Sequence, residues 1–224
     1  VGGFEGKQRY GADYMIAGKD GVHPGWAGQL VMAYAFLKAM GLDGEIATIT
    51  LNWADGAATA SDGHRVLSAQ SGRIEIESSR YPFCAAGPAN NDGSLRSGMT
   101  LVPFNAELNR FMLVVPNAPA GNYRVTWGET SKTYSAGNLA AGVNLAADFE
   151  TNPFSEAFKR VDDAVANKQD YETRQIKNLF HGPEGRADAA MTAELTEKVR
   201  APLAEAVRTA FVPVRHTIAV ASEP

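Results

Sequence analysis

The segment Asp20-Gly21-Val22-His23 places a carboxylate three residues before an imidazole, within a turn that contains a glycine. At this separation the Asp20 carboxylate can accept a hydrogen bond from the Nδ1–H group of His23. That bond would fix the imidazole tautomer and leave Nε2 free to take a proton from a hydroxyl group and later give it to a leaving alcohol. Asp20 and His23 are therefore the candidate catalytic residues. The alternative roles are a turn-forming aspartate and a surface or helix-capping histidine.

The segment that follows the pair is predicted to form a helix that anchors it. Between Trp26 and Met40, apolar side chains occupy most of the circumference of a helix, and Gly41 is suited to end it. Pro24 is compatible with a first helical turn, so His23 is expected in the loop immediately before the helix. We expect the helix to be well buried and Trp26 to be buried at its start. A place for Trp26 in a pocket beside His23 is the alternative.

The residues before the pair are predicted to form a long irregular loop. Residues 1–19 contain five glycines and show no sustained periodicity. Because a domain normally opens with an element of its core, an opening loop of this length is expected in the middle of a longer protein.

A β-rich module is predicted for residues 46–135. Short apolar segments alternate there with turn signals such as Asp55-Gly56 and Asp62-Gly63, which is typical of an antiparallel sheet. Residues 82–103, between the two halves of the module, are expected to form a long surface loop that could face a substrate. The expected strands are residues 46–53, 57–60, 65–69, 73–78, 110–115, 121–127 and 131–135.

Helices are predicted for most of the remaining chain. Apolar residues recur every three to four positions in residues 154–165 and 171–180, and residues 187–199 and 203–211 also indicate helices. Residues 215–224 carry no predicted element. The chain is thus divided into residues 1–45 with the Asp–His pair, a β-rich module of residues 46–135, and a helical region of residues 136–224.

Composition and charge argue against several classes of protein. With 45% hydrophobic and 21% charged residues, the 224-residue chain is expected to fold into one or two compact units. Its 21 basic and 25 acidic residues give a net charge of −4, and the basic residues form no stripe that could follow a nucleic acid. The longest apolar stretch, residues 30–37, is far shorter than the roughly 20 residues that span a bilayer. Neither a nucleic-acid partner nor a membrane span is expected.

Metal and cofactor sites are not expected either. His64, His181 and His216 lie far apart in the sequence, without the spacing of paired metal ligands, and we predict that they are surface residues. Cys84, the single cysteine, cannot form an internal disulfide and is expected to be a half-buried thiol in a strand or turn.

The residues around the Asp–His pair resemble the last motif block of the SGNH/GDSL hydrolases. The pattern is Asp-x-x-His-Pro at residues 20–24, followed by a small residue, Ala27-Gly28 and an apolar helix. The likeness is clearest over residues 19–42. The strands that follow, and the helix start at residues 152–155, also resemble bacterial GDSL lipolytic proteins with a β insert before C-terminal helices.

The resemblance implies an α/β fold in which this chain is the C-terminal part of a flavodoxin-like core, with an inserted small antiparallel β module and C-terminal helices. In that family three earlier blocks supply a serine nucleophile and a glycine and an asparagine as oxyanion donors. Those blocks are not found in this sequence. No Gly-Asp-Ser segment follows a strand, Asn91-Asp92 lacks the glycine two residues before the asparagine, and no Gly-x-Ser-x-Gly elbow occurs.

Three interpretations stay open. The chain is the C-terminal part of a longer or cleaved enzyme whose N-terminal portion carries the serine, an inactive remnant, or a different protein in which the motif arose by chance. The first predicts a serine esterase for short acyl or acetyl esters, carbohydrate esters among them, with His23 as the base and Asp20 as its orienting partner. Related bacterial enzymes are frequently exported, but these residues do not fix a compartment.

A hypothesis of another class is a non-catalytic binding or interaction module, built on the β-rich residues 46–135 with the helices as a docking surface. Trp53, Tyr81, Trp127 and Tyr134 are its candidate ligand platforms. Trp53 and Trp127 fall in predicted strands, where a place in the core is the alternative role. Only an esterase would release p-nitrophenol from an acetyl ester, so that assay discriminates between the two hypotheses.

Overall fold

The structure, a computed structural model, describes residues 2–224. It divides into two compact units, one formed by the residues up to Asn152 together with Arg215–Pro224, the other by Pro153–Val214. The predicted division into residues 1–45, 46–135 and 136–224 groups the chain differently. The difference arises because the first unit takes strands from residues 46–135 and also from residues 143–144 and 215–222.

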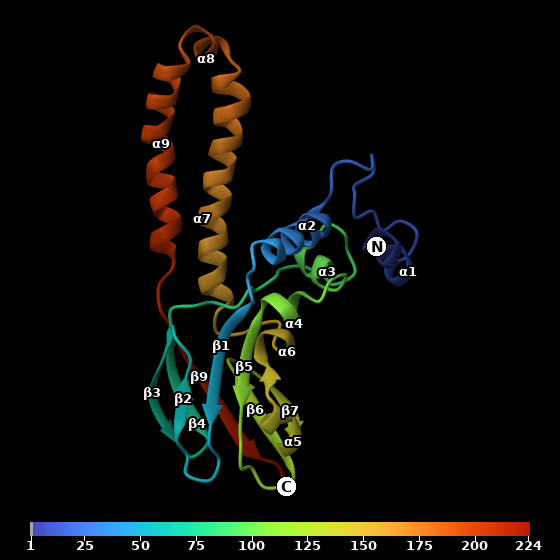
Figure 1. Cartoon of the computed structure of the whole chain (residues 1–224), viewed down its shortest axis with the longest axis vertical. Coiled ribbons are helices and arrows are strands. Elements are labelled where there is room, and N and C mark those ends of the chain that lie inside the picture. Colours follow the sequence, from blue (N-terminus) through green and yellow to red (C-terminus); the bar gives the residue numbers. More distant parts are fainter. Residues whose placement is uncertain (1) are drawn as a thin grey trace. The chain divides into compact units, whose positions relative to one another are not determined.

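Two sheets in the described residues give the first unit a mixed α/β fold (Figure 1). The four-stranded sheet has the order β2-β1-β5-β8, with β1 (Glu45–Leu51) antiparallel to β2 (Ala58–Ala60) but parallel to β5 (Arg110–Val114). The short strand β8 (Val143–Asn144) runs antiparallel to β5. The prediction of a purely antiparallel module is therefore wrong for this sheet, because the long connection from β2 to β5 returns the chain so that β5 runs in the direction of β1.

The five-stranded sheet has a central strand that sequence patterns did not predict. Its order is β3-β4-β9-β6-β7, and β9 (Val214–Ser222) covers most of the region for which no element was expected. Along β9 the side chains of His216, Ile218 and Val220 are buried in alternation, as a half-buried strand requires. The other strands of this sheet are β3 (His64–Gln70), β4 (Arg73–Ser78), β6 (Asn122–Trp127) and β7 (Thr130–Ser135).

The seven predicted strands are confirmed, each within two residues of its expected bounds. Their alternating pattern follows from a core that lies between the two sheets. Phe111 of the four-stranded sheet and Trp127 of the five-stranded sheet are both wholly buried, with ring centroids 5.1 Å apart. Phe111 also contacts the rings of His64 and His216. Burial of these aromatic side chains is a large part of what holds the sheets together.

The helices of the first unit depart from the predictions in three places. The expected loop of residues 1–19 contains α1 (Gly2–Tyr10), and the expected surface loop of residues 82–103 contains α3 (Leu95–Met99). α2 (Trp26–Ala39) is confirmed, but this chain buries only one of its faces, and Trp26 is exposed rather than buried. The three glycines of α1 lower its intrinsic helix propensity, so tertiary contacts must stabilise it. The remaining helices are α4 (Phe104–Leu108), α5 (Ala136–Ala141) and α6 (Leu145–Asp148).

The flavodoxin-like core implied by the resemblance is not visible in the described chain. Residues 2–44 contain α1 and α2 and no strand, and neither sheet is the all-parallel sheet of such a core. The mixed α/β class is thus confirmed, while the finer architecture stays a prediction.

The second unit is a helical hairpin. α7 (Ser155–Arg174) continues as a π-helical turn (Gln175–Phe180), a short helix α8 (Pro183–Ala187) follows, and α9 (Ala189–Ala210) returns alongside α7 (Figure 1). Residues 187–199 and 203–211 were predicted as two helices, but α9 is continuous through Pro202. One proline removes one helical hydrogen bond, and the packing of α9 along α7 can offset that loss. No helix within residues 2–224 is long and apolar enough to cross a membrane.

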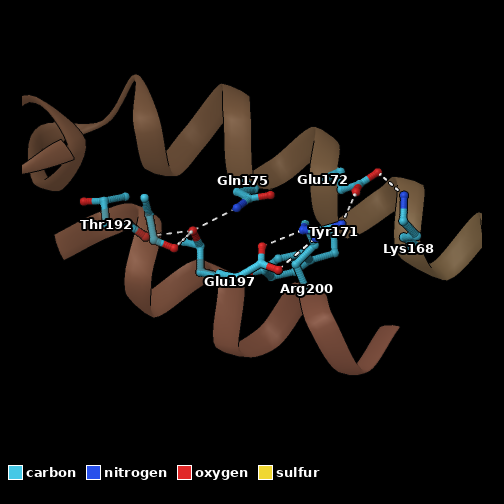
Figure 2. A network of polar contacts seen from close by, with 9 residues as sticks. Lys168, Tyr171, Glu172, Gln175, Thr192, Glu197 and Arg200 are labelled. Atoms are coloured by element: carbon cyan, nitrogen blue, oxygen red, sulfur yellow. Dashed lines mark hydrogen bonds and ion pairs between the residues drawn. The ribbon is translucent and has the colours of Figure 1, made fainter. Parts of the chain in front are cut away.

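Polar contacts line the seam of this hairpin (Figure 2). The Tyr171 hydroxyl donates to the carbonyl oxygen of Thr196 at 3.0 Å, and the Gln175 amide donates to the Thr196 hydroxyl at 2.8 Å. Further along, Arg200 pairs with Glu172 and Glu197. These contacts fix which residues of α7 and α9 face each other.

Candidate active site

The Asp20–His23 hydrogen bond predicted from the sequence is present. The Nδ1 atom of His23 lies 2.5 Å from Oδ2 of Asp20, and the other carboxylate oxygen accepts hydrogen bonds from the backbone amides of Val22 and His23 at 3.1 and 3.0 Å. The hydrogen bond from the His23 ring, followed by the two amide bonds, holds the pKa of the Asp20 carboxyl below its usual value. An ionised carboxylate only accepts hydrogen bonds, so Nδ1 must be the donor.

The second ring nitrogen of His23 is available for chemistry. The side chain is 85% exposed and that of Asp20 is 52% exposed, and Nε2 has no hydrogen-bond partner among the described residues. An imidazole that is oriented through Nδ1 and open at Nε2 can serve as a general base toward a hydroxyl group. No serine of the described chain is bonded to it, so the nucleophile that the family resemblance requires is not assembled within residues 2–224.

Two glycines allow the His23 loop to fold back on α2. Gly18 has φ +79°, and a Cβ atom there would lie 2.1 Å from the carbonyl oxygen of His23. A Cβ atom on Gly28, in the first turn of α2, would lie 2.2 Å from the carbonyl oxygen of Ile16. Because both approaches are closer than any real Cβ contact, glycine is required at each position. The loop is therefore held tightly against the helix start, although the pair itself is exposed.

Asp92, 77 positions beyond Met15, accepts hydrogen bonds from both ends of the His23 loop, which runs from Met15 to Ala27. Its carboxylate accepts a hydrogen bond from the backbone amide of Met15 at 2.7 Å, on the side where the chain enters the loop. Its backbone carbonyl accepts from the amide of Ala27 at 3.0 Å, on the side where α2 begins. One residue thus holds both ends of the loop between Met15 and Ala27. The sequence predicts only a surface loop for the segment that contains Asp92.

The residues after Asp92 extend this support. The hydroxyl of Tyr14 lies 2.6 Å from that of Ser97, and the hydroxyl of Tyr10 lies 2.6 Å from that of Thr100. Gly98 of α3 packs against the first turn of α2, where an added Cβ would lie 2.6 Å from the carbonyl oxygen of Ala27. No local pattern signals such contacts, because their partners lie 71 to 90 residues apart.

Two open hollows flank the pair within the first unit. One, of about 630 Å³, is lined on its polar side by Lys7, Lys19 and Asp20. The other, of about 360 Å³, is mainly apolar and is lined by Val22 and Met32, among others. Both are open grooves that lie against the loop between Met15 and Pro24, which carries His23.

A serine–histidine contact lies in the core and is unsuited to catalysis. The hydroxyl of Ser78 lies 2.8 Å from Nδ1 of His64 and 2.9 Å from Nε2 of His216, and all three residues are buried. The outer ring nitrogens are also bonded, Nε2 of His64 to the carbonyl oxygen of Ile46 and Nδ1 of His216 to the indole N–H of Trp127. The prediction that His64 and His216 are surface residues is therefore wrong, because both fill polar positions inside the core.

These partners determine the direction of every hydrogen bond in the network. Nδ1 of His216 accepts from Trp127, so its Nε2 carries the proton and donates to Ser78. The Ser78 hydroxyl then donates to Nδ1 of His64, whose Nε2 donates to the carbonyl oxygen of Ile46. Both histidines are neutral in this arrangement, and neither has a ring nitrogen left for a substrate.

Other predicted features are placed as follows. Cys84 lies in the loop after β4, near Asn152, rather than in a strand or turn, and its expected half-burial is confirmed. No group of three or more His, Cys, Asp or Glu residues within residues 2–224 could hold a metal ion. Of the aromatic platforms considered for a binding module, Trp127 is wholly buried, whereas Trp53 is half-buried and packs edge-on against Tyr123.

Comparisons with known proteins give a likeness of fold. No protein-family model and no curated protein sequence matches the chain. A solved structure of a gut microbial diltiazem-metabolizing enzyme is similar, with a TM-score of 0.69 and 20% sequence identity. The likeness covers 99% of this chain but only 60% of the other, so this chain spans little more than half the length of the protein whose fold it shares.

Proposed function

We propose that the chain supplies the acid–base half of a serine esterase of the SGNH/GDSL type, with His23 as the general base and Asp20 as the residue that orients it. The observation that carries this proposal is the 2.5 Å contact between Nδ1 of His23 and the Asp20 carboxylate, combined with an exposed and unbonded Nε2. The serine comes from polypeptide outside these 224 residues, in the N-terminal portion of the same enzyme. The similarity to a longer enzyme structure supports this division.

The proposed reaction is acyl transfer from an ester to serine and then to water. Nε2 of His23 takes the serine proton as the serine oxygen bonds to the ester carbonyl carbon, and the carbonyl oxygen becomes an oxyanion. When the carbon–alkoxy bond breaks, Nε2 returns that proton to the leaving alcohol. Water then repeats the sequence and releases the carboxylic acid. Throughout, the ionised Asp20 stabilises the protonated imidazole and keeps Nδ1 as the donor.

We infer short acyl or acetyl esters of small molecules, carbohydrate esters included, as the substrate class. The structurally similar protein is described as metabolizing diltiazem, a small molecule, which is compatible with this inference. The exposure of His23 also fits a site whose walls are completed by other residues.

The test is hydrolysis of p-nitrophenyl acetate by the native protein, purified with every polypeptide that accompanies the chain, before and after His23→Ala. We expect His23→Ala to abolish turnover, and Asp13→Asn, at an exposed aspartate of the same region, to leave it unchanged. Intact mass spectrometry after treatment with a fluorophosphonate should find the label on a serine outside residues 1–224. Turnover that persists in His23→Ala would refute the proposal.

A second candidate function is ligand binding without catalysis at a groove beside Trp53. This groove, of about 360 Å³, lies between the β1–β2 turn, the β3–β4 turn and β9, and Asn52, Ser71 and Ser222 also line it. An aromatic ring beside amide and hydroxyl groups is a common setting for polar organic ligands. This function predicts no p-nitrophenol release that depends on His23.

A further inference from the structure

α2 presents two apolar faces, of which this chain covers one. The inner face, with Ala27, Gly28 and Leu30, is buried against the first unit. On the outer face, Trp26, Met32, Phe36 and Met40 are 63%, 48%, 65% and 68% exposed, and Val22, just before the helix, is 71% exposed. These five residues are called the outer face of α2 below.

An outer face of this composition is unusual for a helix at a protein surface. A surface helix normally has one apolar stripe and a polar opposite side, whereas a helix that is apolar all round belongs in an interior. Between Trp26 and Met40 the only charged residue is Lys38, and it pairs with Glu107 at 2.9 Å. The sequence pattern thus describes a helix that is covered on both sides, and the first unit supplies only one cover.

We propose that the outer face of α2 is the docking surface for the polypeptide that carries the nucleophilic serine. This inference rests on the proposed function, and it adds where the two parts meet. Val22 and Trp26 flank His23 in the sequence, so the apolar surface reaches the catalytic base itself. For proton transfer the serine oxygen must come within about 3 Å of Nε2, so its polypeptide must come close to the loop that precedes α2.

The size and chemistry of the occupant follow from two further observations. The similar solved structure is longer, and the part of it without a counterpart here is 40% of its length, enough for a second layer of a fold. The apolar hollow of about 360 Å³ lined by Val22, Val31 and Met32 continues the outer face toward the loop. The occupant is therefore a folded polypeptide that presents an uncharged, apolar surface to α2 and a serine at the edge of that surface.

The experiment compares interface variants with a matched exposed methionine elsewhere. Phe36→Ser and Met40→Ser are introduced into the native protein with its accompanying polypeptide, and Met191→Ser, at a 59% exposed position of α9, is the control. We expect the two interface variants to slow fluorophosphonate labelling of the serine about tenfold or more, and backbone amides of α2 to exchange with solvent correspondingly faster. Met191→Ser should change neither rate.

The outcomes separate this inference from the proposed function. If His23→Ala abolishes turnover while Phe36→Ser and Met40→Ser leave labelling and amide exchange at the control rates, the docking surface is refuted and the proposed function stands. If His23→Ala retains turnover, the proposed function fails first. A chain that forms a homodimer through α2, seen as protection of α2 amides together with a doubled mass in light scattering, would overturn the assignment of the occupant. Protection of α2 only by added phospholipid vesicles would also overturn it.

Discussion

The first unit contains two histidine arrangements with opposite properties. In the core, His64 and His216 have both ring nitrogens bonded, and burial lowers the pKa of His216 to about 3 and also lowers that of His64. At the surface, His23 is held by one nitrogen only, through Asp20, and the other is open. A histidine contributes to packing when both nitrogens are satisfied, and can contribute to chemistry when one is oriented and one is free.

The same comparison shows why proximity to serine is a poor criterion for catalysis. Ser78 lies within hydrogen-bond distance of two histidines, yet its hydroxyl is wholly buried and its proton is committed to His64. His23 has no serine beside it in the described residues, yet its ring has the orientation and access that a general base needs. Four experiments test this contrast.

The largest effect is expected for Asp20→Asn. An amide at this position can donate a hydrogen bond to Nδ1 and so favours the wrong imidazole tautomer, and we expect ester turnover to fall by roughly 10³- to 10⁴-fold. The free energy of unfolding should change little, because the pair is exposed. Steady-state hydrolysis of p-nitrophenyl acetate by the native protein and urea unfolding measure the two quantities. Turnover within a factor of ten of the unaltered protein would contradict the role of Asp20.

A substitution in the buried histidine network is expected to lower the free energy of unfolding. His216→Leu removes the ring nitrogen that accepts from the Trp127 indole N–H and the ring N–H that donates to Ser78, and we expect the free energy of unfolding to fall by about 2 to 4 kcal/mol. His23→Leu, at the exposed site, should lower it by less than about 1 kcal/mol. Urea unfolding followed by tryptophan fluorescence provides both values. Equal losses in the two variants would remove the distinction between the two arrangements.

Acid should destabilise the protein through the buried histidines. Their folded-state pKa values lie below the usual value of 6.5, so their contribution to stability is complete above pH 6.5 and is lost as the pH falls from 6.5 toward about 3 for His216. The slope is at most about 1.4 kcal/mol per pH unit for each group that stays neutral. Urea unfolding between pH 7 and pH 4 measures it. The slope should decrease in His216→Leu, and an unchanged slope in that variant would contradict the role of the buried histidines.

A smaller effect is expected for Asp92, which acts on the reaction only by positioning the His23 loop. Asp92→Ala removes the bond to the Met15 amide but keeps the backbone bond to Ala27, and we expect turnover to fall about tenfold or less. Asp92→Asn retains a side-chain oxygen that can accept from Met15 and should restore most of it. Nitrogen-15 NMR of the His23 ring, which reports protonation of Nδ1, should follow the same order. An unchanged ring spectrum in Asp92→Ala would contradict the positioning role.

The strands were predictable because their pattern is local. Residues such as Ile74 and Ile76 alternate with polar neighbours, and glycine turns separate the strands, so two-residue periodicity was sufficient. β9 escaped prediction although His216, Ile218 and Val220 alternate in the same way. Its first buried position is a histidine, which local patterns assign to the surface, and only the partners Ser78 and Trp127 make that residue suited to a core.

The candidate site, like the strands, was predictable only where its contacts are local in the sequence. Asp20 and His23 are three residues apart, so their hydrogen bond could be inferred from spacing alone. The support from Asp92, Ser97 and Thr100 depends on contacts between residues far apart in the sequence, which only the folded chain reveals. The expected burial of α2 holds for one of its faces only, because composition does not say whether a second surface covers the other.

The central position of β9 has a consequence for how the protein is made. The hairpins β3–β4 and β6–β7 lie on opposite sides of β9, so they cannot join into one sheet until it arrives. The ribosome must first translate everything between Trp127 and Val214, including the whole helical hairpin, which takes about 4 to 17 seconds at ordinary rates of synthesis. During that interval β4 and β6 each keep an open edge that can pair with another nascent chain. The longer these two edges stay unpaired, the more folded protein we expect to be lost to pairing between nascent chains.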